Sequence, residues 1–354
     1  MRNILHVTSF MFHVTRPPTP EVFRLCFGIL WVLFSMSGFQ ERIDYEGSIS
    51  VLLNKVCKDY GFSDYISHQV IPMGYEDFNI ALKTKEEKYF VKIFASFRNE
   101  KNIKRYVSII ERVVEAGILH PKLYKASGRY LYEITIDGSA IRLVVMNYIK
   151  GQSFYETKGK LSNDEAKIIV QQAALINRIA LKPALTYDSW SVVNFLKEYK
   201  KAKQYLSKED DKLIAPVMEK FASVDLEKLP HTFVHGDIIK TNILKDISGR
   251  LFITDFSVAN YYPRIQELAV ILCNLLFDEE NSHHSKEYYE LAISEYQKQI
   301  TLTSEELELL PLYIKAGHAM HVIGGTNHKS KKGNAPEENE YWINLGLTGL
   351  RQMA

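Results

Sequence analysis

The sequence predicts an α+β protein with a small antiparallel β lobe, carrying one helix, followed by a larger and mainly α-helical lobe. Two changes in pattern support this expectation. Residues 66–149 contain short β-rich segments separated by charged or glycine-bearing turns. From Gly151 onward, apolar residues recur mostly at helical spacing. We therefore expect an N-terminal extension at residues 1–35, a first lobe at 36–149 and a second lobe at 150–354.

The first lobe should be a sheet built from hairpins, because its β-rich segments are joined by polar turns such as KTKEEK and IDGSA. One helix is expected at residues 99–116, where Ile103, Val107, Ile110 and Val114 follow helical spacing and Gly117 marks the end. The expected strands are residues 67–73, 78–84, 88–94, 130–136 and 141–149.

The second lobe should be mostly helical. A polar loop is expected at Lys329–Asn339, whose charge run is typical of a solvated connection. The expected helices are residues 163–179, 192–206, 212–222, 267–276, 286–299 and 304–321.

The composition is that of a globular protein and gives no reason to expect nucleic acid as a partner. The 354 residues are 46% hydrophobic and 24% charged, and 44 basic against 42 acidic side chains leave a net charge of +2. The three cysteines, Cys26, Cys57 and Cys273, match no paired spacing of a zinc site or a disulfide framework. We therefore expect a reducing, cytoplasmic location.

The N-terminal extension carries an apolar run, Leu25–Phe34, after a proline-rich stretch. Three interpretations stay open. The run is short for a membrane anchor, since a span needs about 20 apolar residues. It has the length of a signal-peptide core but only a thin basic flank. Alternatively, the true start is Met36. Membrane contact is expected only if the run is an anchor.

The most informative stretch is residues 233–260, FVHGDIIKTNILKDISGRLFITDFSVAN. His235-Gly236-Asp237 interrupts an apolar approach, and Asn242 follows Asp237 by five positions. Asp255 interrupts a second apolar run. The DISG turn at residues 246–249 joins two short β segments, so two carboxylates and one amide should converge.

Such a set of side chains suits phosphoryl transfer. The protein must then position a nucleophile and help metal ions neutralise charge on the phosphate oxygens. Magnesium prefers oxygen donors and commonly takes one or two carboxylates from the protein. Asn242 and Asp255 are therefore the expected Mg²⁺ ligands. Asp237 is the expected catalytic carboxylate, which orients the acceptor hydroxyl and takes its proton.

At these residues the chain resembles the aminoglycoside phosphotransferase and choline kinase group, relatives of the protein kinases. His-Gly-Asp, four residues, Asn, and later Asp-Phe are the family's pattern, matched here by residues 235–237, Asn242 and Asp255-Phe256. The resemblance implies a two-lobed protein kinase-like fold. It also implies transfer of the γ-phosphate of ATP to a hydroxyl of a small molecule. By the same resemblance His235 props up the catalytic loop.

The resemblance places the phosphate-binding lysine at Lys92, in the β segment YFVKIF. An edge-strand lysine facing water is the alternative. A carboxylate partner should come from the following helix. Glu100 shares a face with Ile103 and Val107 and is the first candidate, with Glu111 or no partner left open.

Two further nucleotide contacts are expected by position. The phosphate-covering turn should lie at residues 72–79, with Gly74 and Asn79. An ordinary hairpin turn would show the same sequence pattern. The interlobe hinge should present Met146, Asn147 and Ile149 to adenine, although these side chains could equally be core.

The acceptor should lie between the catalytic loop and the C-terminal helices. Glu267 stands where relatives usually have Asp and is expected to brace the loop. Residues 278–280 are expected to form a solvated acidic turn, with an amine-bearing acceptor as the alternative. The acceptors that stay open are an aminoglycoside, another amino sugar, choline or ethanolamine, homoserine, a ribose derivative and a protein hydroxyl. The rival interpretations are a nucleotide-binding pseudokinase scaffold and a membrane-anchored receptor.

Overall fold

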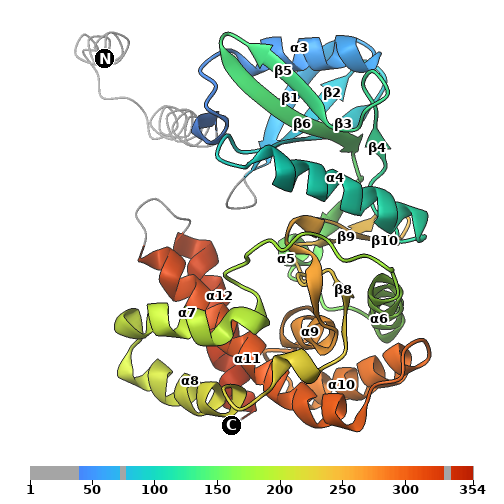
Figure 1. The fold of residues 1–354 in the computed structure, drawn as a ribbon. Helices are drawn as coiled ribbons and strands as arrows, with labels where there is room; N and C mark the ends of the chain where they lie inside the picture. The colour runs from blue at the N-terminus through green and yellow to red at the C-terminus, as the bar shows by residue number, and fades with distance from the viewer. Residues whose placement is uncertain (1–39, 72–76, 331–335, 354) are drawn as a thin grey trace, which may run out of the picture. The chain divides into compact units, whose positions relative to one another are not determined.

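The computed structural model describes residues 40–71, 77–330 and 336–353 (Figure 1). The N-terminal apolar run therefore lies outside the described residues. Within the described ranges, no helix combines the length and apolar character that a bilayer span requires.

The described chain forms two compact units. Unit 1 contains residues 40–97 and 125–145, and unit 2 contains residues 98–124 and those from 146 onward. Sequence analysis placed the helix at residues 99–116 with the first lobe. Its counterpart, α4 (Glu100–Glu115), groups with unit 2 instead.

Unit 1 contains an antiparallel sheet in which β1, β2 and β3 pair in sequence, and β5 pairs with β6. The hairpins confirm the pattern that the sequence predicts. In the β2–β3 register Asn79 lies opposite Lys92. The strands are β1 Tyr65–Ile71, β2 Phe78–Thr84, β3 Lys88–Ile93, β5 Tyr132–Ile136 and β6 Ser139–Asn147, whose last two residues belong to unit 2.

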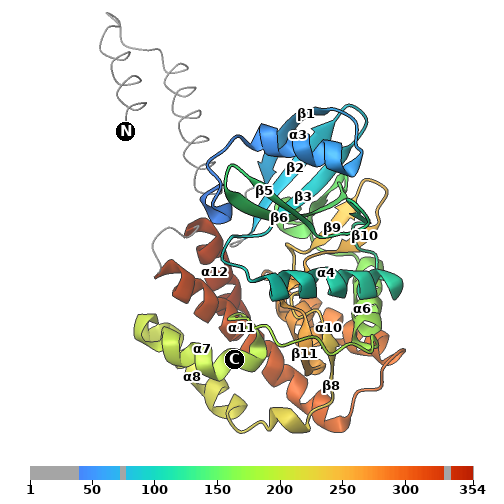
Figure 2. The same cartoon turned by 45° about the horizontal axis from the view of Figure 1, so that its top comes forward.

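A helix that the sequence analysis did not identify, α3 (Ile49–Tyr60), packs beside β1 (Figure 2). It buries Leu52, Leu53 and Val56, which lie on one helical face. It ends at Gly61, whose φ of 68° places it in the left-handed region that glycine adopts without strain.

Unit 2 is built around one continuous hydrophobic core, to which nearly all of its helices contribute. Helix α11 runs through this core, with Tyr313, Ala316, Ala319 and Val322 fully buried. The helices are α4, α5 Phe154–Thr157, α6 Asn163–Asn177, α7 Phe195–Ala202, α8 Lys208–Phe221, α9 Ile265–Val270, α10 Ser282–Gln297, α11 Ser304–Lys329 and α12 Pro336–Gln352.

Two small antiparallel sheets in unit 2 carry the His-Gly-Asp, Asn and Asp-Phe residues of the stretch 233–260. One has the strand order β10-β9-β7, and in the other β11 pairs with β8. Their strands are β7 Gly151–Ser153, β8 His231–Val234, β9 Ile243–Asp246, β10 Leu251–Ile253 and β11 Asn260–Pro263. The motif residues therefore lie in the loops that leave β8, enter β9 and follow β10.

The C-terminal region differs most from the sequence-based expectation. Helix α11 extends to Lys329, and α12 begins at Pro336, within the stretch expected to be a polar loop. Helix α12 packs closely along α11. This approach depends on glycine, because a Cβ on Gly346 would lie 2.4 Å from the backbone oxygen of His318.

Candidate active site

The structure brings Asp237 and Asn242 into direct contact. They lie near the start and at the end of the catalytic loop, residues 235–242. The Asn242 amide Nδ2 donates to the Asp237 backbone oxygen at 2.9 Å and to its Oδ2 at 2.7 Å. Thr254 donates from its backbone N (2.9 Å) and its hydroxyl (3.1 Å) to the Asn242 backbone oxygen. Asp255 is thereby held next to the same loop, as the spacing of the motif predicts.

Asp255 has a backbone conformation that is unusual for a residue other than glycine. Its φ is 62°, in the left-handed region, and its Oδ1 accepts from the Ser257 backbone N at 3.3 Å. Such conformations cost free energy and are found preferentially at functional sites. The bend turns the chain from β10 into the short helical turn Phe256–Val258.

His235 supports the loop from inside the protein. Its Nδ1 accepts from the Asp237 backbone N at 3.1 Å, so Nε2 carries the proton that it donates to the Thr254 backbone oxygen at 3.0 Å. Its ring packs against Phe256 at 4.2 Å between centroids. Burial lowers the pKa of His235 to about 4, which keeps the ring neutral. The expected supporting role is confirmed by these contacts.

Gly236 and Glu267 form the brace that the sequence analysis expected. Gly236 has a φ of 79°, which a side chain would strain, and its N–H donates to Glu267 Oε2 at 3.1 Å. Glu267 is fully buried. Burial raises the pKa of Glu267 to about 8, although its hydrogen bonds to the loop oppose that rise. The side chain thus touches the loop backbone next to Asp237.

The electrostatics of Asp237 reveal a further carboxylate that sequence reasoning missed. Burial, and then the charges of Asp188 and Asp255, raise the pKa of Asp237 to about 8. Asp188 lies in the connection after α6, where its Oδ1 accepts from the Trp190 backbone N at 2.9 Å. Its sequence signal is only that of an ordinary turn former, so nothing singled it out.

The donor set fits the magnesium ion that the motif predicts. Asn242 points Nδ2 at Asp237, which leaves its oxygen directed elsewhere, and Asp255 supplies a carboxylate. Over the described residues there is no group of three or more His, Cys, Asp or Glu side chains placed to hold a metal by themselves. One carboxylate and one amide suit Mg²⁺, because phosphate and water complete its shell.

Lys92 is buried in β3 and is paired within its own unit. Its Nζ lies 3.2 Å from Asp77 Oδ2, and the side chains are only 7% and 4% exposed. Asp77 Oδ1 also accepts from the Ala95 backbone N at 3.2 Å. The water-facing alternative for Lys92 is therefore wrong. Sequence reasoning missed Asp77. It immediately precedes β2, and only the pairing of β2 with β3 brings it close to Lys92.

Glu100 does not point inward as expected. It occupies the first turn of α4, its side chain is 57% exposed, and it forms an ion pair with Lys104 one turn away. The helix begins after Asn99, whose side chain caps the backbone N of Asn102 at 2.8 Å. First-turn acidic residues are favoured there by the helix dipole, which explains the position. Glu111 is also exposed.

The structure describes most, but not all, of the other residues that were expected to contact the nucleotide. Gly74 lies outside the described residues, and Asn79 is the second residue of β2. At the expected hinge, Asn147 both donates to and accepts from Lys122, through its backbone N (3.0 Å) and its Oδ1 (2.5 Å). Since backbone groups alternate along a strand, those of Met146 face the opposite side.

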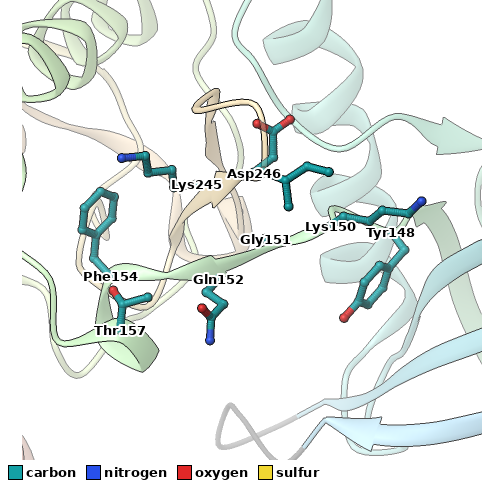
Figure 3. A pocket seen from close by; sticks show the side chains of 9 residues that line it. Tyr148, Lys150, Gly151, Gln152, Phe154, Thr157, Lys245 and Asp246 are labelled. Carbon is teal, nitrogen blue, oxygen red and sulfur yellow. The ribbon is translucent and has the colours of Figure 1, made fainter.

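Beyond the hinge, unit 2 has an open pocket of about 530 Å³ between residues 148–157 and 245–247. Figure 3 shows Tyr148 and Gln152 projecting from one segment, with Lys245 and Asp246 on the neighbouring one. Gln152 lies opposite Lys245 in the β7–β9 pair. Ile149, expected to contact adenine, adjoins this pocket in sequence and is half-buried.

Arg105 of α4 connects three segments of unit 2. It donates to the backbone oxygens of Ala184 (2.6 Å), Ser257 (3.3 Å) and Ala259, and to Oδ1 of Asn260 (3.1 Å). It is only 8% exposed. The segment that follows Asp255 is thus fixed to α4 and to the connection that carries Asp188.

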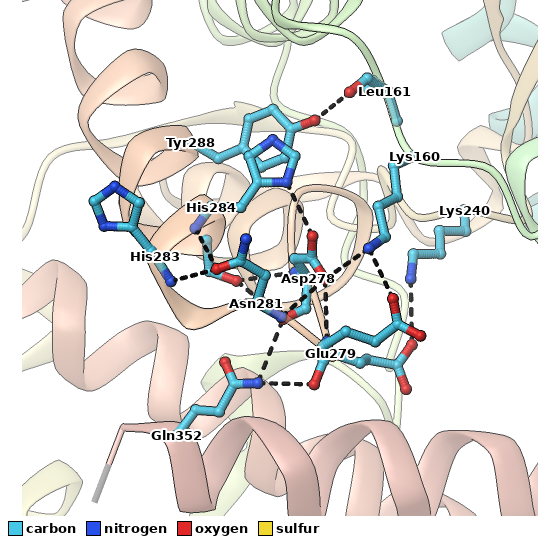
Figure 4. A network of polar contacts seen from close by, with 12 residues as sticks. Lys160, Leu161, Lys240, Asp278, Glu279, Asn281, His283, His284, Tyr288 and Gln352 are labelled. Atoms are coloured by element: carbon cyan, nitrogen blue, oxygen red, sulfur yellow. Dashed lines mark hydrogen bonds and ion pairs between the residues drawn. The ribbon is translucent and has the colours of Figure 1, made fainter.

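The acidic turn at residues 278–280 is not simply solvated. Asp278 is only 3% exposed, and it accepts from Lys160 Nζ at 2.9 Å and contacts His284 Nδ1 at 2.9 Å (Figure 4). Glu279 lies 3.6 Å from Lys240. Burial alone would raise the pKa of Asp278, but its hydrogen bonds with Lys160 and His284 lower that pKa to about 2. The turn therefore serves as an anchor before α10.

Comparison with known proteins agrees with this geometry. Residues 67–298 match the model of the phosphotransferase enzyme family, and the chain belongs to that family. It is therefore a phosphotransferase with a protein kinase-like, two-lobed fold. The family match spans both the β sheet of unit 1 and the catalytic loop of unit 2. None of the curated proteins matches the sequence.

Solved structures with similar folds include small-molecule kinases. An amicoumacin kinase in complex with AMP-PNP, Ca²⁺ and amicoumacin has a TM-score of 0.63 at 15% identity, covering 87% of this chain and 94% of that one. Spectinomycin phosphotransferase with ADP and spectinomycin has 0.59 at 15%, covering 87% and 100%. A choline kinase from Streptococcus pneumoniae has 0.56 at 15%, covering 85% and 98%. These similarities concern the fold.

Proposed function

We propose that the protein is an ATP-dependent kinase that transfers the γ-phosphate to a hydroxyl group of a small-molecule acceptor. The observation that carries the proposal is the Asp237 carboxylate, bonded to Asn242 at 2.7 Å and adjacent to Asp255, in a loop fixed by His235 and Glu267. A carboxylate held this firmly can orient an attacking hydroxyl.

In the proposed reaction, the acceptor oxygen attacks the γ-phosphorus, and the bond from that phosphorus to the bridging oxygen of ADP breaks. The hydroxyl proton passes to Asp237. Asn242 and Asp255 would hold Mg²⁺, which neutralises charge developing on the phosphate oxygens. Lys92 would contact the α and β phosphates, which requires it to exchange its bond with Asp77 for phosphate oxygens.

Charge and aromatic side chains in unit 2 favour an acceptor that carries an amine. Asp188 adds negative charge near Asp237. Trp342 of α12 forms a buried apolar cluster with Phe277 and Leu345. Tyr341 and, from the catalytic loop, Ile239 pack against this cluster, and Tyr155 meets Tyr341 edge to face at 5.0 Å. Carboxylates and aromatic faces both attract cations. Aminoglycosides, other amino sugars and choline-like compounds therefore come first, and homoserine-like acceptors second.

The test is a panel of hydroxylated metabolites incubated with the protein, ATP and Mg²⁺, and analysed by mass spectrometry for the gain of one phosphoryl group. The panel should contain aminoglycosides, choline, ethanolamine and homoserine, each with and without EDTA. Asp237→Asn is the matched inactive control. We expect a metal-dependent product that this variant does not form. Tight nucleotide binding without turnover of any compound would instead favour a pseudokinase.

A further inference from the structure

The catalytic loop is also held by hydrogen bonds at Lys240, in its second half, in addition to the bond between Gly236 and Glu267. The peptide of Lys240, three residues after Asp237 and two before Asn242, is bonded on both sides. Its N–H donates to Oδ1 of Asn274 at 3.0 Å, and its carbonyl accepts from the Tyr155 backbone N at 3.1 Å. The loop is therefore anchored at two backbone points, Gly236 and Lys240.

The two anchors come from one continuous helical segment. Glu267 belongs to α9, and Asn274 lies seven residues later in the π-helical turn Ile271–Leu275 that continues it. Short π-helical turns are rare and are frequently found at functional sites. Asn274 is fully buried, so its bonds are not exchanged with solvent.

The orientation of Asn274 is fixed by a second partner, His321 of α11. Because Oδ1 of Asn274 accepts from Lys240, its Nδ2 faces His321 Nε2 at 3.2 Å and must donate to it. His321 is therefore neutral, with its proton on Nδ1. Burial, assisted by the Lys240 cation, lowers the pKa of His321 to about 3, in agreement with this assignment.

His321 is itself held by the helix that carries the aromatic residues. Its ring stacks on Trp342 at 5.5 Å between centroids and 13° between planes. Ile239, the residue before Lys240, packs against the apolar cluster of Phe277, Trp342 and Leu345. The C-terminal helix pair is thus linked to the catalytic loop in two ways. One is this apolar cluster, and the other is the hydrogen bonds that join His321 through Asn274 to Lys240.

We propose that Asn274, oriented by His321, is a positioning residue for phosphoryl transfer, which holds the Lys240 peptide so that Asp237 and Asn242 keep their mutual geometry. This inference rests on the proposed function. The competing explanation is that Asn274 only satisfies buried polar groups and stabilises the fold. The two explanations differ in whether kcat depends on these bonds once the protein is folded.

The experiment compares four variants by kcat, by KM for ATP and by melting temperature. Asn274→Ala removes both bonds, and we expect kcat to fall by about 10- to 100-fold, since a displacement of 1 Å can cost about 100-fold. KM for ATP should stay within about twofold, because the groups that would contact ATP are unchanged. His321→Gln keeps an acceptor, whereas His321→Phe keeps only the ring. We expect Phe, not Gln, to reproduce most of the loss.

Thr303→Ala is the matched stability control. Thr303 caps the N-terminus of the same helix, α11, by accepting from the Glu306 backbone N at 3.1 Å. Its loss should lower the melting temperature and leave kcat unchanged. Wild-type kcat in folded Asn274→Ala, or equal kcat in the two His321 variants, would overturn the proposal. The His321 pair also decides the matter if Asn274→Ala does not fold.

Hydrogen exchange of the Lys240 amide gives a readout that is independent of turnover. We expect faster exchange at this amide in Asn274→Ala and His321→Phe than in Thr303→Ala. If the wild-type protein phosphorylates no compound, the proposed function fails. The positioning proposal is then decided by exchange alone, and unchanged protection of Lys240 in Asn274→Ala overturns it.

Discussion

Lys92 is buried and Asp237 is half-buried, and the charges that surround them are opposite in kind. Lys92, in unit 1, has the carboxylate of Asp77 at 3.2 Å, so its charge is balanced inside the protein. Asp237, in unit 2, is near Asp188 and Asp255, and these like charges add to burial in raising its pKa to about 8. Clustered carboxylates cost folding free energy and are retained where chemistry needs them. The comparison predicts that a bound cation would lower the pKa of Asp237, whereas the charge of Lys92 is already balanced by Asp77.

The largest expected effect tests the Asp237 side of this comparison. Asp237→Asn should keep the bond to Asn242 but cannot accept a proton, so kcat should fall by about 10²- to 10⁴-fold. ATP affinity, measured by calorimetry, should be nearly unchanged. Turnover equal to that of the wild type would remove Asp237 from its role.

Asp255→Ala provides the contrast to Asp237→Asn. As a proposed metal ligand, Asp255 should affect binding rather than proton transfer alone. We expect this variant to lose the magnesium dependence of nucleotide binding. A metal-dependent affinity equal to that of the wild type would separate Asp255 from the metal site.

The comparison also explains what the sequence could predict. Asp237, Asn242 and Asp255 lie within nineteen residues, so strand ends and one turn suffice to bring them together. Asp77 and Asp188 depend on pairings and connections that no local pattern encodes. Glu100 was assigned by helical face, but at the start of α4 its side chain is exposed and pairs with Lys104 instead. The fold class and strands followed from periodicity, whereas α12 was hidden by the polar composition of its first turn.

The third prediction tests whether Asp77 balances the charge of Lys92 inside the protein. Lys92→Met should lower kcat/KM for ATP by about 10²-fold, since one preorganised charge is lost. Asp77→Asn leaves a buried ammonium without this carboxylate and should cost about 3–5 kcal/mol in the free energy of unfolding, measured in urea.

The double variant Asp77→Asn/Lys92→Met closes this cycle. It should recover most of the stability and none of the activity, because two neutral groups then replace the pair. If the two single changes are additive in stability, the ion pair does not balance the charge of Lys92, and the contrast with Asp237 is lost.

A smaller effect is expected at Arg105, a buried cation whose hydrogen bonds to Ala184, Ser257, Ala259 and Asn260 all go to neutral oxygens. Arg105→Lys retains the charge but not the planar fork of donors. We expect the segment after Asp255 to loosen, so that kcat falls by about tenfold and more Mg²⁺ is needed for half-maximal rate. An unchanged magnesium requirement would show that Arg105 contributes to stability alone.

The smallest expected effect concerns stability as a function of pH. The pKa of Asp237 is raised from 3.8 to about 8 in the folded protein, so folding favours its protonated form. Its ionisation therefore reduces stability progressively as the pH rises from the unfolded pKa, and the full penalty is present above the folded pKa.

Asp237→Asn should then melt higher than the metal-free wild type at pH 9, and the two should melt alike at pH 3.5. For a chain of 354 residues, each kcal/mol recovered is worth about 1–2 °C. Added Mg²⁺ should raise the melting temperature of the wild type at pH 9 more than that of Asp237→Asn, because a nearby cation relieves the repulsion only where Asp237 is charged. An equal magnesium effect on both proteins would mean that Asp237 does not depend on an external cation.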